Sequence, residues 1–235
     1  GLPQPITAAT GMDALTHAIE AYISGWAIAE SDRLAETAVR AIFEHLPVAC
    51  NDGGNLLARE RMALAATWAG MAFTRANVGN VHAIAHQLGG RYHTPHGLAN
   101  AIMLPHVLRF SLPAATPRLA ALARAVGVGK ARDAEGVLAK RFIDAVEALA
   151  AQVGIPQRLD ALVEADIPEL AAAACWEADT NYPVPRRMSE ADCAELLGRV
   201  LPEVVPGPAR RKRGSAKAAK AANPVKTKKR AAKAS

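Results

Sequence analysis

The sequence has few aromatic residues, few cysteines and no long apolar run. Aromatic residues make up 4% of the 235 residues, and runs of β-branched residues are scarce. Alanine, which has the highest helix propensity, is abundant by contrast. No apolar stretch approaches the roughly 20 residues that a membrane-spanning helix needs. With a hydrophobic content of 51%, the chain is predicted to be an all-α globular helical bundle with a sizeable core and no membrane partner.

The three cysteines, Cys50, Cys175 and Cys193, are widely separated, and none belongs to a CxxC pair. An odd and sparse set argues against a disulfide scaffold and is typical of a reducing cytoplasm. The N-terminus shows no secretory signal and begins with Gly1 rather than Met. We therefore expect a cytoplasmic chain that is a processed product or a fragment.

Several metal-binding and phosphate-binding motifs are also missing. No histidine has an adjacent aspartate, as an HD-type phosphohydrolase requires, and no ExxH pair of a di-iron bundle occurs. The HExxH motif, the G-x-G-x-x-G motif and the P-loop are absent as well. These absences exclude the common templates for zinc proteases and for nucleotide binding within the chain.

The positive net charge of +6 comes from the C-terminal segment. Residues 207–235 hold 11 of the 28 Lys and Arg residues and no Asp or Glu, which leaves the rest of the chain mildly acidic. The composition predicts a helical domain over residues 1–205 and a disordered basic tail over residues 206–235.

The predicted tail would attract nucleic acid or another polyanion, with steep salt dependence. It has no aromatic residue to stack on bases, so such binding would be independent of sequence. A solubilising or unselected extension is the alternative interpretation.

Glycine, proline and capping signals divide the chain into helices joined by short connections. Thr10 is expected to cap the first helix, Pro47 to end the second, and Gly89-Gly90 to interrupt the fourth. The sequence shows no hairpin signal and no repeat. The expected helices cover residues 10–24, 30–46, 56–74, 82–88, 96–110, 112–126, 134–153, 167–176 and 189–201.

Histidines are concentrated in one short stretch. Residues 81–97 hold four of the seven, namely His82, His86, His93 and His96, together with a proline and several glycines. His82 and His86 are four residues apart, which places them on one face of a helix. Such a pair can hold a metal, but it is equally compatible with a surface or core position.

Asp13 and His17 have the same four-residue spacing on the first predicted helix. Alone, this pair is most simply a solvated helix face. Asp13 combined with three of the four imidazoles of His17, His82, His86 and His96 would form a mixed nitrogen and oxygen site suited to Fe(II), Zn(II) or a similar divalent ion. A remaining histidine would then serve as a supporting group or a proton relay.

Two stretches resemble the signatures of the iron-containing (group III) alcohol dehydrogenases. They are GMDALTHAIEAYIS, at residues 11–24, and GNVHAIAHQLGGRYHTPHGLANAIMLPHVLRF, at residues 79–110. Their order and separation agree with that family, and so does the helical content up to about residue 203. The resemblance implies the family's C-terminal metal-binding helical bundle, as in the dehydroquinate synthase-like fold, without the N-terminal nucleotide-binding domain.

The resemblance also implies functional residues. The family's metal ligands match Asp13, His17, His82 and His96, and the ion would be Fe(II) or Zn(II). His86 matches a histidine close to the substrate and is a candidate for proton transfer or for holding the nicotinamide. The implied reaction is hydride transfer between a small alcohol or aldehyde and NAD or NADP, with the metal acting as a Lewis acid.

Other interpretations remain beside this one. The chain could be a non-catalytic remnant or a metal-binding module whose basic tail binds nucleic acid. A homo-oligomer, or a partner that supplies the missing nucleotide-binding half, is also compatible with the resemblance. Maleylacetate reductase shares the fold but departs from these ligand positions, so the retention of all four argues against it.

The remaining polar residues near these motifs have simpler interpretations. Glu20, one turn beyond His17, either orients a ligand or is an exposed glutamate. His93 either lines the pocket or lies on a surface loop. His45 and His106 are expected to be structural.

Overall fold

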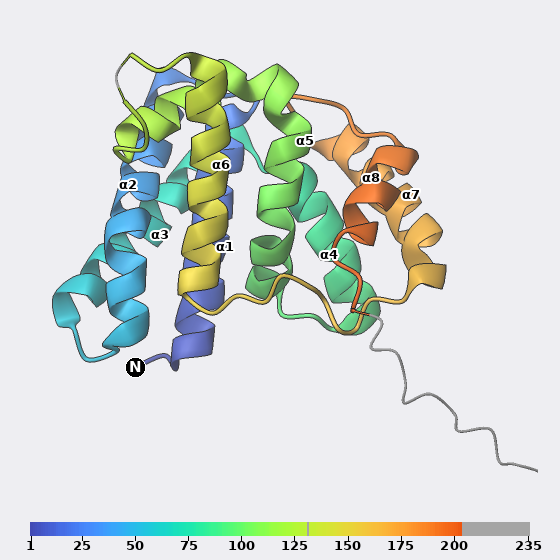
Figure 1. The fold of residues 1–235 in the computed structure, drawn as a ribbon, viewed down its shortest axis with the longest axis horizontal. Coiled ribbons are helices and arrows are strands. Elements are labelled where there is room, and N and C mark those ends of the chain that lie inside the picture. The colour runs from blue at the N-terminus through green and yellow to red at the C-terminus, as the bar shows by residue number, and fades with distance from the viewer. Residues whose placement is uncertain (131, 204–235) are drawn as a thin grey trace, which may run out of the picture. The chain divides into compact units, whose positions relative to one another are not determined.

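In a computed structural model, which describes residues 1–130 and 132–203, every regular element is a helix (Figure 1). The predicted all-α fold is therefore confirmed, and the basic segment predicted over residues 206–235 lies outside the described residues. No helix in the described part of the chain is both long enough and apolar enough to cross a membrane. The helices are α1 (Gln4–Ile23), α2 (Ala29–Asn51), α3 (Leu56–Ala76), α4 (Asn80–Tyr92), α5 (His96–Ala125), α6 (Glu135–Gln152), the short η1 (Glu164–Asp166), α7 (Ile167–Asn181) and α8 (Glu190–Gly198).

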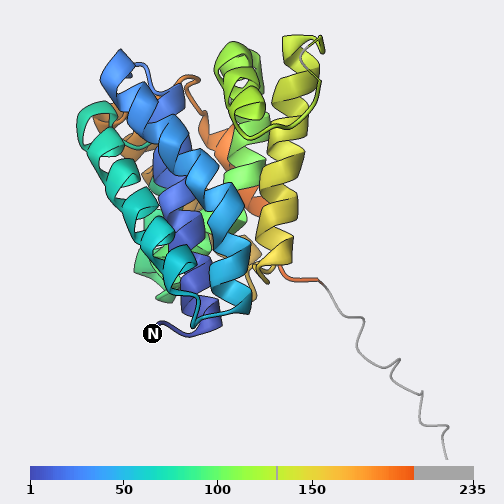
Figure 2. The same cartoon turned by 90° about the vertical axis from the view of Figure 1, so that its left-hand side faces the viewer.

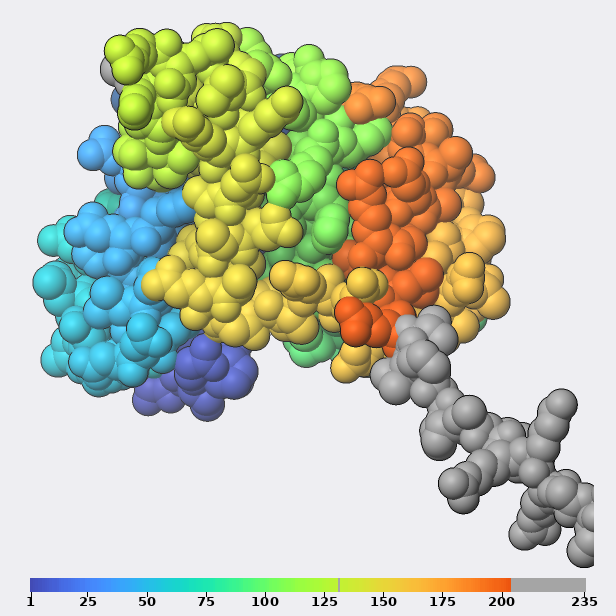
Figure 3. Space-filling model, viewed as in Figure 1, coloured from blue at the N-terminus to red at the C-terminus, as the bar shows by residue number. Residues whose placement is uncertain are grey.

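Helix α1 is central to the arrangement. It packs against α2, α3 and α5, while α5 also packs against α4 and α6. Helix α7 contacts both α4 and α8. Figure 2 shows α1, α2 and α3 running alongside one another, and in Figure 3 α6 and the segment after it lie between α2 on one side and α8 on the other.

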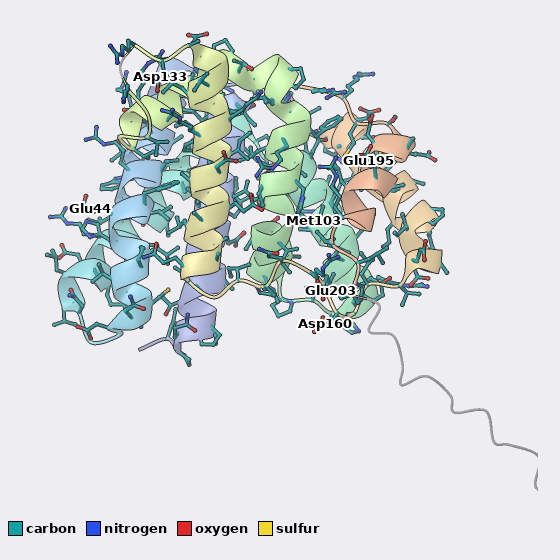
Figure 4. The ribbon with its side chains drawn as sticks, viewed as in Figure 1. Glu44, Met103, Asp133, Asp160, Glu195 and Glu203 are labelled. Carbon is teal, nitrogen blue, oxygen red and sulfur yellow. The ribbon has the colours of Figure 1, made fainter. Side chains whose placement is uncertain are left out.

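Every long helix contributes buried side chains to the core. Figure 4 labels Met103, which is fully buried on α5, and also Glu44 and Glu195, whose side chains lie at the surface. The buried face of α3 consists only of alanines, so that helix can approach α1 closely. The largest fully buried side chains are Met12, Leu15, Ile19, Ile42, Leu46, Ile84, Leu88, Met103, Leu104, Leu108, Leu119 and Phe142.

The predicted start of the first helix was wrong. Helix α1 begins at Gln4, and Pro5 lies in its first turn, where the missing N–H of proline has no helical partner to lose. Thr10 does not cap the helix, because its hydroxyl donates a hydrogen bond back to the Ile6 carbonyl at 2.8 Å.

Prolines and glycines break fewer helices than predicted. Helix α2 continues through Pro47, α4 continues through Gly89-Gly90, and α5 is one helix where two were expected. A proline inside a helix costs about 3 kcal/mol. Fully burying a large aliphatic side chain contributes about 1.5–3 kcal/mol, and α5 buries several, including Leu108 and Leu119, so packing offsets its three prolines.

Gly97 allows the N-terminus of α5 to approach α1. A Cβ at this position would lie 2.5 Å from the Ala9 carbonyl oxygen. We predict that Gly97→Ala lowers the free energy of unfolding by about 1–3 kcal/mol, because the two backbones must separate. The measurement is urea unfolding followed by circular dichroism.

The matched control is Gly136→Ala on α6, where a Cβ would meet no atom within 4 Å. This variant should leave the free energy of unfolding unchanged or raise it by about 0.5–1 kcal/mol. Equal stability of the two variants would contradict the close approach at Gly97.

Candidate metal centre

Three helices bring the four predicted ligands together. Asp13 and His17 lie on α1, His82 lies in the first turn of α4, and His96 is the first residue of α5. One nitrogen or oxygen atom from each of the four side chains lies within 4.8 Å of the others. The Asp13–His17 pair, which is weak evidence alone, therefore joins His82 and His96 in one cluster.

The donor atoms converge on the Asp13 carboxylate. Its Oδ1 lies 3.6 Å from His96 Nε2, 3.9 Å from His82 Nε2 and 3.9 Å from His17 Nδ1. The His17 and His82 rings are 4.3 Å apart between centroids, and Phe73 stacks on His17 at 4.4 Å. Phe73 therefore covers one side of the cluster with an apolar ring.

Burial keeps two of these imidazoles neutral. It lowers the pKa of His17 to about 4, with a further contribution from the neighbouring His82, and the Asp13 charge opposes this only in part. Burial also lowers the pKa of His96. Neutral imidazole is the form that binds a metal ion, so these residues are ready to do so at neutral pH.

Asn100 lies at the centre of the cluster. Its Nδ2 is 2.7 Å from Asp13 Oδ1, 3.0 Å from His96 Nε2 and 3.1 Å from His82 Nε2. An amide nitrogen carries only two hydrogens, so it cannot satisfy three acceptors. The buried Asn100 Oδ1 has no hydrogen-bond partner among the described residues. Three imidazoles and one carboxylate, whose lone pairs a single amide cannot all satisfy, fit a divalent cation such as Fe(II) or Zn(II).

Glu20 orients His82, as one of the two sequence interpretations predicted, and the exposed alternative is wrong. The side chain is buried, and its Oε2 accepts a hydrogen bond from His82 Nδ1 at 2.6 Å. The carboxylate also accepts the backbone N–H groups of Gly79, at 2.9 Å, and Val81, at 2.7 Å. Because the carboxylate can only accept, His82 carries its proton on Nδ1 and presents Nε2 to the cluster.

His86 lies beside the cluster but is not one of its four donors. Its ring centroid is 5.3 Å from that of His96 and 5.9 Å from that of His82, and the side chain is 39% exposed. Its Nδ1 is 2.6 Å from Glu177 Oε1. His86 is therefore next to the four donors, with part of its side chain open to solvent.

The other histidines lie outside the cluster. His93 is exposed and ends α4 with a left-handed backbone, at φ 54°. His45 lies on α2 next to Glu44. His106 lines a cavity of about 100 Å³ beside α6, and burial lowers its pKa.

Two residues of the site were missed in the sequence. Asn100 follows His96 by four residues on α5, and this helical spacing was a usable signal. Glu177 is 91 residues away from His86 along the chain, and no local pattern connects them.

Comparison with known proteins identifies the family. Residues 7–201 match the Fe-containing alcohol dehydrogenase family, C-terminal. The chain is 47% identical over 199 residues to 1,3-propanediol dehydrogenase of Citrobacter freundii, covering 84% of this chain and 51% of that enzyme. It is 39% identical over 201 residues to the NAD-dependent methanol dehydrogenase of Bacillus methanolicus, covering 85% and 52% of the two chains.

A solved structure agrees with this match. The crystal structure of a 1,3-propanediol oxidoreductase superposes with a TM-score of 0.83 at 43% identity, over 86% of this chain and 53% of that one. The chain belongs to the iron-containing alcohol dehydrogenase family, and the resemblance of its two signature stretches is confirmed. It spans about half the length of the relatives it matches.

Removing the histidine that either α4 or α5 contributes to the cluster should abolish tight metal binding. We predict that the chain, purified anaerobically with ferrous iron, retains about one ion, and that His82→Ala and His96→Ala lose tight binding of it, because each variant removes one of the four donors. Elemental mass spectrometry measures the metal content. His45→Gln, which removes an imidazole outside the cluster, is the control, and retention of metal by both alanine variants would refute the ligand assignment.

The low pKa of His17 predicts acid sensitivity of the metal-free chain. The ordinary histidine value is 6.5 and the folded value is about 4, so between these pH values the unfolded chain binds a proton that the folded chain does not. The free energy of unfolding should therefore fall as pH drops from about 6.5 towards about 4. Urea unfolding with a chelator should show a shallower fall for His17→Gln than for wild type or His45→Gln. Identical slopes would contradict the prediction.

Proposed function

We propose that this chain is the C-terminal, metal-binding half of an NAD(P)-dependent alcohol dehydrogenase that interconverts small alcohols with aldehydes or ketones. The observation that carries the proposal is the convergence of Asp13, His17, His82 and His96 in one cluster. The names of two relatives, 1,3-propanediol dehydrogenase and NAD-dependent methanol dehydrogenase, support small alcohols as substrates and NAD as the cofactor. Fe(II) is the proposed resident ion, and Zn(II) would suit the same donors.

We propose that residues 1–205 form the helical metal-binding domain and that the nicotinamide is bound by a nucleotide-binding half outside these 235 residues. The described residues are helical, and the chain contains neither of the glycine-rich phosphate-binding motifs. The match to only about half of each relative supports the same division.

The bound ion, Asp13 and Glu20 would have different roles in the proposed site. A bound divalent ion would supply Lewis acidity toward an alcohol or carbonyl oxygen. Asp13 is the only carboxylate among the four donors, so the donor set carries one negative charge when its imidazoles are neutral. Glu20 holds His82 in the tautomer that presents Nε2 to the cluster.

His86 is the proposed proton acceptor for a substrate hydroxyl. Its Nδ1 is engaged by Glu177, and its Nε2 has no hydrogen-bond partner among the described residues. A free imidazole nitrogen beside the cluster can accept or return a proton as hydride leaves or reaches the substrate carbon.

The alternative of a non-catalytic module would rest on the basic segment at residues 206–235. That segment lies outside the described residues. A remnant has no need to keep four donors together with the buried Glu20 that orients one of them. We therefore favour the enzyme.

The test fuses this chain behind the nucleotide-binding half of the Citrobacter freundii 1,3-propanediol dehydrogenase. We expect the iron-loaded fusion to form NADH with 1,3-propanediol or 1-propanol, and the fusion carrying His82→Ala to lose this activity together with its metal. His45→Gln is the matched control and should keep both. A folded fusion that binds iron and NAD but oxidises no small alcohol would refute the proposed function.

A further inference from the structure

Glu177, on α7, is the centre of a hydrogen-bond network that the metal cluster does not include. Its carboxylate accepts hydrogen bonds from His86 Nδ1 at 2.6 Å, Tyr182 Oη at 2.6 Å and Gln87 Nε2 at 2.7 Å. The side chain is 18% exposed. Three donors, two on α4 and one directly after α7, therefore hold the Glu177 carboxylate against α4.

The surrounding structure holds this network in place. Helix α7 packs directly on α4, and its last residue is tied to the end of α3 by the hydrogen bond from Asn77 Nδ2 to the Asn181 carbonyl, at 3.0 Å. The backbone N–H of Gly25 donates to the Pro183 carbonyl at 2.8 Å. Burial and the hydrogen bond to Glu177 raise the pKa of Tyr182, so its hydroxyl remains a donor at neutral pH.

We propose that Glu177 is a positioning residue of the proposed active site, which holds His86 with its proton on Nδ1 and leaves Nε2 free beside the cluster. A carboxylate can only accept, so an imidazole nitrogen bonded to it must carry the proton. The His86 ring lies nearly parallel to that of His96, at 20° and 5.3 Å. The inference deepens the proposed function and rests on it, because the free Nε2 is the atom that would exchange a proton with substrate.

A hydrogen bond between a histidine Nδ1 and a carboxylate from another helix occurs twice on α4. Glu20 from α1 fixes Nδ1 of His82, and Glu177 from α7 fixes Nδ1 of His86 one helical turn later. One carboxylate is buried and serves a proposed metal ligand. The other is partly exposed and serves the histidine on the open side. Both histidines of α4 are thus fixed in the same tautomer by carboxylates from different helices.

The test reads the tautomer directly by NMR. Long-range ¹H–¹⁵N spectra of the ¹⁵N-labelled full chain, metal-free with a chelator at pH 8, distinguish the protonated ring nitrogen from the unprotonated one. His86→Gln assigns the His86 signals. We expect His86 to carry its proton on Nδ1 in the wild type, and to lose this preference in Glu177→Ala while the His82 signals stay unchanged.

Two further variants keep the result interpretable. Glu169→Ala removes an exposed carboxylate from the same helix and should leave the His86 signals as in wild type. Glu177→Gln keeps the side-chain size but can donate as well as accept, so it should weaken the preference of His86 for the Nδ1–H form even if the alanine variant is poorly folded. A proton on Nε2 of His86 in the wild type, or an unchanged Nδ1–H form in folded Glu177→Ala, would overturn the proposal.

Kinetics of the fusion enzyme separate this proposal from the proposed function. In the fusion carrying Glu177→Ala, kcat should fall by about 10²-fold, because proton transfer by a positioned group typically contributes that much or more. KM and iron content should stay close to those of the wild type. A fusion without turnover whose His86 tautomer still depends on Glu177 would refute the function and uphold the positioning. An active fusion whose kcat is unaffected by Glu177→Ala would refute the positioning role and leave the function standing.

Discussion

The buried carboxylate of Glu20 is the interaction on which the rest of the site depends. A charge removed from water is costly unless hydrogen bonds replace its solvation, and here two backbone N–H groups at the start of α4 and one imidazole do so. The N-terminal end of a helix also favours a negative charge. This arrangement fixes α4 relative to α1, and a Cβ at Gly79 would lie only 2.9 Å from Glu20 Oε1. The register of α4 then places His82 in the cluster and His86 one turn further on.

Small residues make the required helix spacing available. The cluster needs α1, α4 and α5 close together, and Gly97 permits backbone contact with Ala9 where α5 begins. Helix α3 also packs against α1, and its alanine face lets Phe73 reach His17. The alanine-rich, aromatic-poor composition therefore does more than favour helix, because it also sets how closely the helices pack around the polar centre.

Much of this arrangement could be predicted from the sequence, and the failures have physical causes. Four-residue spacings and two signature stretches predicted the cluster, because ligands on one helix face leave a local pattern. Helix ends were predicted less well, since local proline and glycine signals do not include the burial that carries α5 through its prolines. Glu177 left no sequence signal, because its position opposite His86 follows from the packing of α7 on α4.

The four donors lie on three different helices, and this has a consequence for folding. An ion held by all four donors would link α1 to α4 and α5, and so join parts of the chain as far apart in sequence as Asp13 and His96. Since this site exists only in the folded state, the free energy of ion binding would add to the free energy of unfolding. The melting temperature of the bundle would then depend on the free metal concentration, and a chain deprived of its ion would be the one most readily unfolded and degraded.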